Sequence, residues 1–572
     1  MPTRLNTVFL VLAAATLPLS AGSVRDIRRT PAGTLWAVGD GGLILTSDDD
    51  GRTWQSRQAD ASADLHQLWI DEPRVWAIGG RATPAYPGGA GQAVILRSLD
   101  GGKTFESLPT GPAGWACGGA ASDDSVVLGG QPTPRAPAGV HHTRSGGKRW
   151  TAVPLDGLGY LRGAAFRNFG YGYFVGQQHR IVSLRNLMQP TLHPADIDSG
   201  VALTAAAFRD AETCWAVGRR GTVVASRPGG QRWAQRSLPY PAGTRSLTHL
   251  EAIDFHDGHT CLIGGGLTGV LFRSGDTQRF EALAAPGPGP VRCLRQLSTT
   301  DILVGGDGGR IWRSTDAGKT WQLSRGPQRC DVLFIAAAGE TSIYPAIVLH
   351  AAAGLDVAVV YVTAPRRPGN QAEMGHADIA PGQQLRLAAA LAGAGGATVI
   401  EELPSLLLDP DADGDANATS ILQRWSEELD APAEPEVLRR LVAAIRLYRP
   451  RVVATGAAEP GPPGIAAENR LVARLAARAV TLASDEESFP QLLGAKLPPH
   501  AADRLFIGTD DNTDWRPPWQ DTIHPARDAA VRIDATRRPD GESDSNIELL
   551  AQRAIWAIGA ASLLDRPARF GT

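Results

Sequence analysis

The sequence predicts a multidomain protein in which an all-β propeller of seven blades precedes an α/β domain built on a parallel sheet. Three observations lead to this prediction. A short motif recurs through the first 330 residues, apolar runs that end in glycine accompany its copies, and beyond residue 330 buried runs alternate with helical patterns. The length of 572 residues also exceeds what a single hydrophobic core supports.

The recurring motif has the form S-x-D-x-G-x-T-W. An Asp and a Ser or Thr can bond backbone N–H groups across a tight turn, glycine adopts a positive φ there, and the aromatic ring packs against the blade. Weaker copies end at Trp150, Trp233 and Phe280, and the closing aromatic residues are 41 to 51 residues apart except for one gap of 83. The clear copies consist of Ser47, Asp49, Gly51, Thr53 and Trp54; Ser98, Asp100, Gly102, Thr104 and Phe105; and Ser314, Asp316, Gly318, Thr320 and Trp321.

Each unit of the repeat is expected to begin with an apolar strand that ends in glycine, followed by a turn, a second short strand and the motif. The long gap holds one further unit at residues 173–186, which keeps the strand pattern without the motif, so the units number seven. Short strands at this period with glycine turns predict a β-propeller. The other six strands are expected at residues 36–39, 76–79, 126–129, 214–218, 261–264 and 302–305.

The repeat resembles the Asp-box, or BNR, family, and residues 36–54 and 304–321 are most similar to the photosystem II assembly-factor type of propeller. The resemblance covers residues 23–328 and implies that the Asp boxes are structural turns without a catalytic role. Sialidases also carry Asp boxes, but their Arg-Ile-Pro string does not occur here and tyrosines are few. A binding or assembly platform is therefore the favoured function of this part of the chain.

Beyond residue 328 the pattern becomes that of a parallel, doubly wound sheet crossed by helices. Ligands in such folds bind at the carboxyl ends of the strands, so the expected site follows the first strand, near residues 336–341. Strands are expected at residues 332–338, 357–362 and 451–455, and helices at 343–353, 384–391, 436–447, 466–483 and 547–564.

Most of residues 329–572 resembles the PIG-L, or LmbE-like, deacetylase family. The similarity implies a Rossmann-like α/β domain whose first strand ends in H-P-D-D-E, where the His and the second Asp bind zinc and the first Asp is the general base. A later H-x-x-H segment adds the third ligand, and zinc hydrolysis needs three ligands with an open water position. The matching residues are 331–336, 357–363, 438–453 with Arg449 and Pro450, and 489–505.

This sequence departs from that family at the metal site. The family's His falls on Ala336, its base on Ala338 and its second Asp on Gly339, whereas Glu340 matches. Because alanine and glycine side chains neither hold a metal nor accept a proton, we expect an inactive domain without zinc.

A relocated zinc site is the alternative for this domain. The segment at residues 460–468 contains no histidine, so such a site would have to use His376, Glu340 or Glu468, whose spacing gives it no support. Under this alternative the protein is a zinc-dependent N-deacetylase of an N-acetylated amino sugar.

An acidic segment partly matches a calcium-binding loop. Asp409, Asp411, Asp413 and Gly414 follow the D-x-D-x-D-G pattern, but Ser420 stands where a bidentate Glu is needed. Weak calcium binding is one interpretation of this segment, and a solvated acidic loop is the favoured one.

Charge and composition exclude some classes of partner. A formal charge of -3 excludes a strongly basic nucleic-acid binder. Residues 1–330 carry 34 basic and 26 acidic side chains, whereas residues 331–572 carry 22 and 33. The positive excess favours an acidic partner, which includes the chain's own second domain, although scattered solvated arginines explain the same excess.

Residues 1–22 have the pattern of a secretory signal peptide. The apolar run at residues 8–19 is followed by small residues, and its 12 residues fall short of the roughly 20 that span a bilayer. We therefore expect an exported protein, periplasmic or extracellular, without a membrane span after cleavage. The five cysteines are scattered and odd in number, which favours neither a zinc knuckle nor a disulfide framework.

Three functions follow from these observations. The favoured one is an exported noncatalytic binding or assembly protein with a protein or carbohydrate partner, whose deacetylase-like domain retains at most carbohydrate binding. The second is the zinc-dependent N-deacetylase, and the third is a sialidase-like glycoside hydrolase. No cofactor is expected under the first hypothesis.

Overall fold

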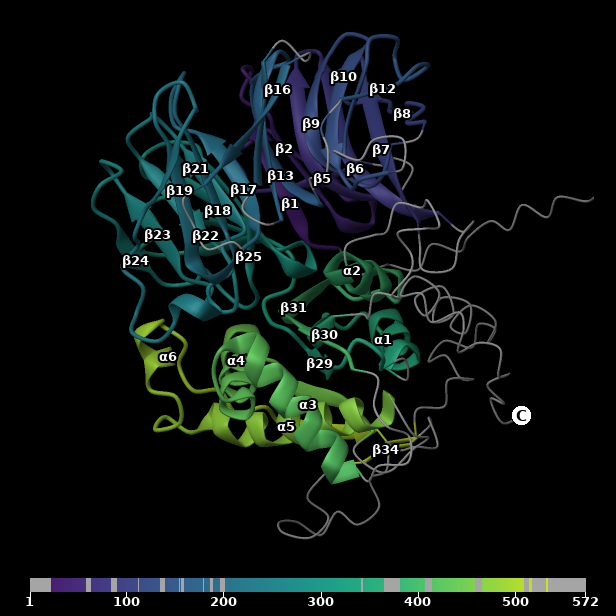
Figure 1. Ribbon diagram of the computed structural model, residues 1–572, viewed down its shortest axis with the longest axis vertical. Helices are drawn as coiled ribbons and strands as arrows, with labels where there is room; N and C mark the ends of the chain where they lie inside the picture. The colour runs from purple at the N-terminus through teal and green to yellow at the C-terminus, as the bar shows by residue number, and fades with distance from the viewer. Residues whose placement is uncertain are drawn as a thin grey trace, which may run out of the picture.

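The computed structural model contains seven four-stranded antiparallel sheets followed by one seven-stranded sheet flanked by helices (Figure 1). The seven small sheets confirm the predicted seven-bladed propeller. The structure describes residues 22–57, 63–83, 90–111, 113–133, 139–153, 155, 159–177, 180–185, 189–195, 201–340, 343–364, 381–406, 414–457, 465–508, 514–516 and 531–532.

Each blade is one unbroken stretch of chain, and its four strands pair in sequence order. Blades 1 to 4 comprise β1–β4 (Val24–Arg29, Leu35–Gly39, Ile44–Ser47, Gln55–Ser56), β5–β8 (Asp64–Asp71, Arg74–Thr83, Ala90–Ser98, Glu106–Ser107), β9–β12 (Ala116–Ser122, Ser125–Gly130, Val140–Thr143, Thr151–Ala152) and β13–β16 (Leu161–Asn168, Tyr171–Gly176, Arg180–Arg185, Gln189–Pro194). Blades 5 to 7 comprise β17–β20 (Leu203–Phe208, Cys214–Gly218, Thr222–Ser226, Trp233–Gln235), β21–β24 (Ala252–Phe255, Cys261–Gly264, Leu271–Ser274, Glu281–Leu283) and β25–β28 (Val291–Gln296, Ile302–Gly306, Ile311–Ser314, Gln322–Arg325).

The first strand of every blade lines the centre of the ring, and these strands follow one another around it until β25 lies beside β1. Side chains bond several of these strands to the next blade. The Asp26 carboxylate accepts a bond from the backbone N–H of Leu68 (2.9 Å), and the Asp254 carboxylate accepts one from that of Gln296 (2.7 Å). At the closing seam, the Ser23 hydroxyl before β1 bonds Asp307 after β26 (2.8 Å).

The apolar strand expected at the start of each unit is in fact the second strand of its blade. The innermost strand precedes it and carries charged side chains toward the central channel, such as Arg25 and Arg28 in β1 and Arg292 and Arg295 in β25. These polar positions interrupt the apolar pattern, which is why the sequence did not indicate the strands.

The clear Asp boxes form the turns between the third and fourth strands of their blades. In the first box the Ser47 hydroxyl donates to Asp49 (2.7 Å), which also accepts bonds from the backbone N–H groups of Arg52 (3.0 Å) and Thr53 (2.9 Å). The Thr53 hydroxyl bond (2.6 Å) and these other donors lower the pKa of Asp49 to about 2. The same Ser, Thr and backbone bonds recur at Asp100 and Asp316.

The glycine and the aromatic residue of a box contact the preceding blade. Gly102 has a φ of +81°, and a Cβ there would run into the ring of Trp36 in β2. Phe105 packs edge-on against the same ring, with centroids 6.2 Å apart. Two further box aromatics make the same kind of contact: Trp233 with Tyr173 (5.3 Å) and Phe280 with Trp215 (6.2 Å).

The C-terminal sheet has the strand order β31-β30-β29-β32-β33-β34-β35, in which the first five strands are parallel and the last two are antiparallel additions. The strands are β29 (Val332–Ala336), β30 (Val357–Ala364), β31 (Gly396–Pro404), β32 (Val452–Ala457), β33 (Arg504–Gly508), β34 (Asp514–Arg516) and β35 (Val531–Arg532). The helices are α1 (Ile343–Ala352), α2 (Pro381–Leu391), α3 (Gly414–Leu429), α4 (Ala433–Tyr448), α5 (Ile465–Ser484) and α6 (Gln491–Gly494).

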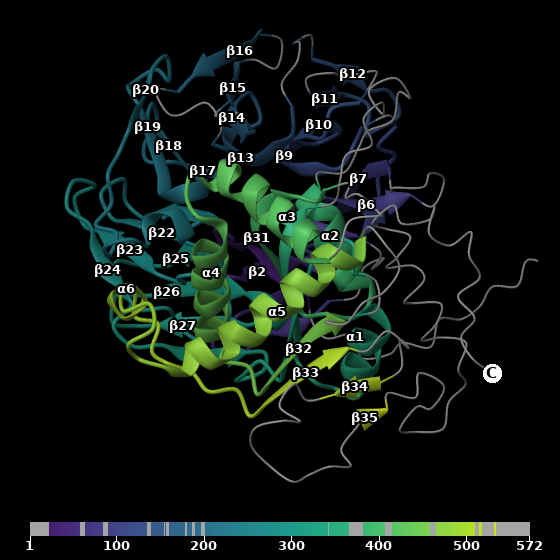
Figure 2. The same cartoon turned by 60° about the horizontal axis from the view of Figure 1, so that its bottom comes forward.

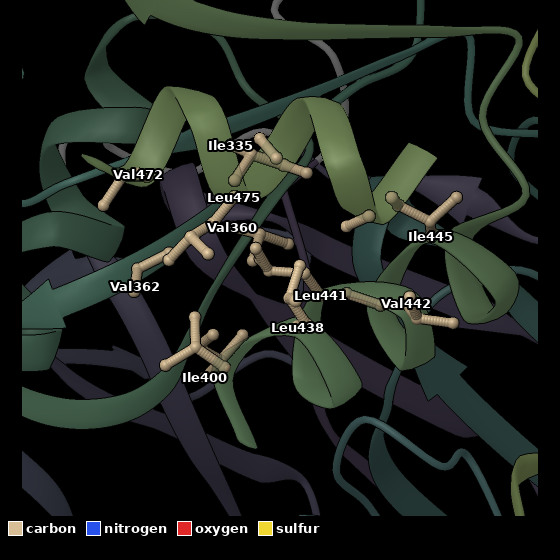
Figure 3. Close-up of a cluster of buried hydrophobic side chains, with 14 of the residues drawn as sticks. Ile335, Val360, Val362, Ile400, Leu438, Leu441, Val442, Ile445, Val472 and Leu475 are labelled. Atoms are coloured by element: carbon tan, nitrogen blue, oxygen red, sulfur yellow. The ribbon is translucent and has the colours of Figure 1, made fainter. Parts of the chain in front are cut away.

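Helices cover both faces of this sheet. Side chains alternate along β29, so that Phe334 packs with α1 and α2 whereas Ile335 packs with α3, α4 and α5. Figure 3 shows the second layer, where Val360 and Ile400 of the sheet meet Leu441 of α4 and neighbouring side chains. Three strands of the sheet (β29, β30 and β32) and α1, α2, α4 and α5 lie where the sequence predicts them, whereas β31, β33 and α3 were not expected.

The predicted helix at residues 547–564 and the predicted signal peptide, apart from Gly22, lie outside the described residues. No helix in the described ranges is long and apolar enough to cross a membrane.

The contact between Gly102 and Trp36 predicts a large effect of one methyl group. Gly102→Ala is expected to lower the free energy of unfolding by about 2–4 kcal/mol, because backbone strain at positive φ adds to a clash with a buried ring. Gly101→Ala is the matched control, since Gly101 also has a positive φ (+72°) but open space around it, and about 1 kcal/mol is expected. Urea unfolding of the two variants measures the difference, and equal losses would show that the blade contact contributes nothing.

Candidate functional site

The edge of the C-terminal sheet where the strand order reverses, between β29 and β32, is where ligands of such folds bind. The three positions that the deacetylase resemblance assigns to metal chemistry, and the matching Glu340, lie there. Ala336 ends β29, and Ala338, Gly339 and Glu340 follow it. Ala336 and Ala338 are buried, and their methyl groups offer neither a metal ligand nor a base.

Glu340 lies across this edge. Its side chain is buried, and a Cβ added to Gly456 of β32 would collide with its carboxylate. Gly456 thus provides the space that the Glu340 side chain occupies, directly at the reversal of the strand order. The Glu340 carboxylate therefore lies against β32 at this point.

Glu468 of α5 is a second buried carboxyl at the same edge. It accepts bonds from the hydroxyls of Thr363 (2.6 Å) and Ser405 (2.6 Å), and the Thr363 hydroxyl in turn accepts a bond from the backbone N–H of Ala338 (2.8 Å). Burial raises the pKa of Glu468. The carboxyl therefore ties β30, β31 and α5 together.

The histidines described in this domain lie elsewhere. His350 bonds the Ala346 carbonyl on α1 (2.6 Å), and His500 bonds the Pro450 carbonyl just before β32 (2.7 Å). His376 falls outside the described residues. Within the described ranges, no three His, Cys, Asp or Glu side chains gather into a metal-binding group.

The acidic segment that partly matches a calcium-binding loop is described from residue 414 onward. Residues 414–420, which would supply its second half, form the first turns of helix α3. A helix turns its side chains outward around its axis instead of directing them to one point, so these residues do not complete a calcium loop. Asp409, Asp411 and Asp413 fall outside the described residues.

The two domains meet at a buried ion pair. Asp307, in the 3-10 helix η4 (Asp307–Gly309) of blade 7, accepts bonds from Arg292 (2.8 and 3.1 Å). It also accepts bonds from the hydroxyls of Ser23 (2.8 Å) and of Tyr448 in α4 (2.8 Å). Arg292 in turn donates to Thr398 of β31 (2.8 Å). Burial opposes ionisation of Asp307, but Arg292 outweighs it and the pKa of Asp307 is lowered.

Other polar contacts surround this pair. Arg310 of the propeller pairs with Asp356, and Arg220 pairs with Glu401 (3.5 Å), so both follow the predicted distribution of charge between the two parts of the chain. The backbone N–H of Gly308 donates to the carbonyl of Gly395 (2.7 Å). These bonds join the propeller to β31 and to the residues beside it.

Apolar packing continues across the same junction. Leu247 and Leu267 of the propeller belong to the hydrophobic core around α4 and α5, and Trp115 belongs to the core around α1 and α2. In Figure 1 the C-terminal domain lies beneath the ring, and Figure 2 shows α2, α3 and α4 in front of its middle. Propeller and sheet therefore share their cores and form one body.

The C-terminal domain closes one end of the propeller's central channel. The channel contains a cavity of about 620 Å³, lined by the innermost strands and by Gln383 and Arg386 of α2 and Thr398 and Val399 of β31. A cavity of this volume is within the range of small-molecule sites. The cavity is the candidate binding site of the molecule.

Several titratable groups lie around the closed end. Burial lowers the pKa of His66 to about 4, so its neutral ring accepts a bond from Trp115 Nε1 (3.1 Å) at neutral pH. Burial and the nearby Asp40 carboxylate raise the pKa of Asp64 to about 7. Asp40 itself is paired with Arg25 (2.6 Å), which holds its pKa low against burial.

Sequence reasoning singled out none of the residues that line this cavity. Their signal is the alternation of charged with apolar residues just before the apolar strand of a unit, as at Arg25 and Arg28 before residues 36–39. The residues that it did single out separate into two groups. The Asp boxes lie at outer turns, and the degenerate metal positions lie at the sheet edge.

Comparison with known proteins matches part of the propeller to a family. Residues 189–328 match the family described as Photosynthesis system II assembly factor YCF48, a stretch of 140 residues out of 572. No curated protein matches the chain.

Solved structures with a similar arrangement cover about half of this chain. The structure titled YCF48 bound to D1 peptide has 18% identity and a TM-score of 0.41, and covers 52% of this chain and 93% of that one. YCF48 from Cyanidioschyzon merolae has 18% identity and a TM-score of 0.41, with 53% and 97% covered. The WD40 beta propeller domain of Doa1 has 14% identity and a TM-score of 0.37, with 52% and 95% covered.

The buried pair at the junction predicts a strong effect of a conservative change. Asp307→Asn is expected to lower the free energy of unfolding by about 3 kcal/mol, because it removes one of the two carboxylate charges that the buried Arg292 faces and leaves Glu251 as the other. Glu427→Gln is the control, since Glu427 is an exposed partner of Arg424 and a change below about 0.5 kcal/mol is expected. Urea unfolding compares the two, and similar small losses would mean that the junction does not depend on this pair.

The raised pKa of Asp64 predicts that the stability of the folded protein depends on pH. Its raised folded-state pKa means that the folded protein binds the extra proton between about pH 4 and 7, so stability falls as the pH rises through this range. Asp64→Asn removes that loss and is expected to exceed the wild type by at least about 1 kcal/mol at about pH 8, with no difference near pH 4. Thermal unfolding across this range, with the exposed Asp71→Asn as control, measures it. A variant that is less stable than the wild type at pH 8 would contradict the expectation.

Proposed function

We propose that the protein is an exported, noncatalytic binding or assembly factor. The propeller is its binding platform, and the C-terminal region is an inactive relative of the PIG-L deacetylases with a Rossmann-like fold. The strand order β31-β30-β29-β32-β33, with helices on both faces, supports that fold. The pattern of residues 1–22 supports export.

One observation carries the noncatalytic part of the proposal. At the reversal of the strand order, methyl groups stand at the positions of a ligand and the base, and the Glu340 carboxylate occupies the space beside Gly456. A zinc hydrolase needs three ligands and an open position for water at this place. The residues here supply methyl groups and the Glu340 carboxylate instead.

Two observations support the binding part. The match of residues 189–328 is to a family described as an assembly factor, which favours a protein partner. The channel cavity of about 620 Å³ lies where both domains contribute to its wall. A carbohydrate partner stays the alternative that the deacetylase resemblance implies.

Zinc content tests the proposal directly. The full chain is dialysed with zinc and then without it, and elemental mass spectrometry is expected to find well below one zinc per chain because the family's ligand positions hold no donor atoms. No acetate release from N-acetylglucosamine is expected.

One zinc per chain would overturn the proposal and favour the zinc-dependent N-deacetylase. The variant Glu468→Gln would then locate the metal, since a relocated site that uses this carboxyl would lose zinc. Release of sialic acid from a synthetic sialoside would instead favour the sialidase-like alternative.

A further inference from the structure

The channel cavity is rich in arginine. Among the described residues that line it, nine are arginines and three are carboxylates, namely Asp26, Glu251 and Asp254. All three carboxylates already have arginine partners, because Arg28 bonds Asp26 (3.0 Å), Arg295 bonds Asp254 (3.2 Å) and Arg292 bonds Glu251 (2.7 Å). Arg25, Arg29 and Arg292 also pair with Asp40, Asp50 and Asp307, which lie outside the lining, so most of this positive charge is already neutralised.

Arg386 of α2 is an arginine of this wall that lacks a close counter-ion. Among the described residues, Glu251 is the carboxylate that comes near it, at 3.9 Å, and Glu251 already accepts two bonds from Arg292 (2.7 and 2.9 Å). No described residue hydrogen-bonds the Arg386 guanidinium, and its Nε is buried without a partner. Its side chain is still 30% exposed and lines the cavity.

Electrostatics agree with this geometry. Burial, together with the neighbouring charges of Arg292 and Arg25, lowers the pKa of Arg386 to about 10 in spite of Glu251. A guanidinium that shares its surroundings with other guanidinium groups is stabilised by any anion that enters.

A second polar group in the same wall lacks partners. Gln131 of blade 3 is 3% exposed, and neither its amide oxygen nor its amide nitrogen has a hydrogen-bond partner. It is connected to α2 through short contacts. The Gln131 N–H donates to the Trp115 carbonyl (2.9 Å), Trp115 Nε1 donates to His66 (3.1 Å), and His66 lies 3.2 Å from Gln383, one turn before Arg386. Gln131 is thus linked to α2, the helix of Arg386, through this sequence of contacts.

We propose that the closed end of the channel binds a carboxylate group, with Arg386 as its counter-ion and the Gln131 amide as a further donor. A guanidinium offers two parallel N–H donors that match the two oxygens of a carboxylate. The proposal rests on the proposed binding function and deepens it by naming the chemistry of the ligand. A small free polycarboxylate and the end of an acidic peptide share this chemistry.

Calorimetric titration of the full chain tests the site with two probes. Tricarballylate represents the free acid, penta-glutamate represents the peptide, and the trimethyl ester of tricarballylate is the uncharged control. At least one charged probe is expected to bind, more weakly as salt is raised, whereas the ester does not. The probe that binds tells the two sources apart.

Variants of Arg386 connect binding to this side chain. Arg386→Gln is expected to raise the Kd of the bound probe by about tenfold or more, because it removes a charge-assisted hydrogen bond, and Arg386→Lys by less because the charge stays. Arg424→Gln, on the exposed face of α3, is expected to leave the Kd unchanged. Without ligand, Arg386→Gln is expected to melt at or above the wild-type temperature, since it removes an uncompensated charge.

Three results would overturn the proposal: no binding of either charged probe, equal binding by Arg386→Gln, or a lower melting temperature of that variant without any ligand effect. The last result would make Arg386 a structural partner of Glu251. These outcomes do not contradict the proposed noncatalytic function, because the zinc content tests that proposal and anion binding does not.

Discussion

The structure depends on the buried pair of Asp307 and Arg292. A carboxylate removed from water is stable only if charge and hydrogen bonds replace its hydration, and Asp307 obtains these from Arg292, Ser23 and Tyr448. The three donors come from blade 7, from the start of the chain before β1 and from α4. A requirement of one side chain thereby fixes the first blade, the last blade and the C-terminal domain against one another.

The same requirement explains the location of the cavity. Arg292 reaches Glu251 at the start of blade 6 and Thr398 of β31, so that β31, an edge of the parallel sheet, lies over the end of the channel. An exposed sheet edge invites pairing with other chains, and docking covers this one. The domain thus contributes a wall to the channel, whereas its own crevice beside Gly456 holds Glu340.

The sequence predicts those features of the fold that a local pattern of residues determines. The Asp boxes specify a turn within five residues, and the repeat of these turns with apolar strands gives seven blades. The innermost strands were missed because channel-facing arginines break their pattern. Helix α3 was missed because its first turns follow a run of aspartates that resembles a loop.

The contacts between the propeller and the C-terminal domain could not be predicted from the sequence, for a different reason. Arg292 and Thr398 are 106 residues apart, and Asp307 and Tyr448 are 141 apart. No local pattern marks such pairs. That Ala336, Ala338 and Gly339 align with the metal positions of the deacetylase family follows from the sequence alone, whereas the position of Glu340 depends on the approach of Gly456 from another strand.

The unbroken course of each blade has a consequence for synthesis. No strand from the end of the propeller completes the first sheet, so the seam between β1 and β25 is held by side chains, and one of its fastenings, Tyr448, comes 123 residues after the end of β28 at Arg325. At about 5–20 residues per second, a ribosome needs roughly 6–25 s to cover that distance. During this interval the nascent propeller lacks the bond from Tyr448 to Asp307. The seam between β1 and β25 is then the part of the propeller that a chaperone would have most reason to cover.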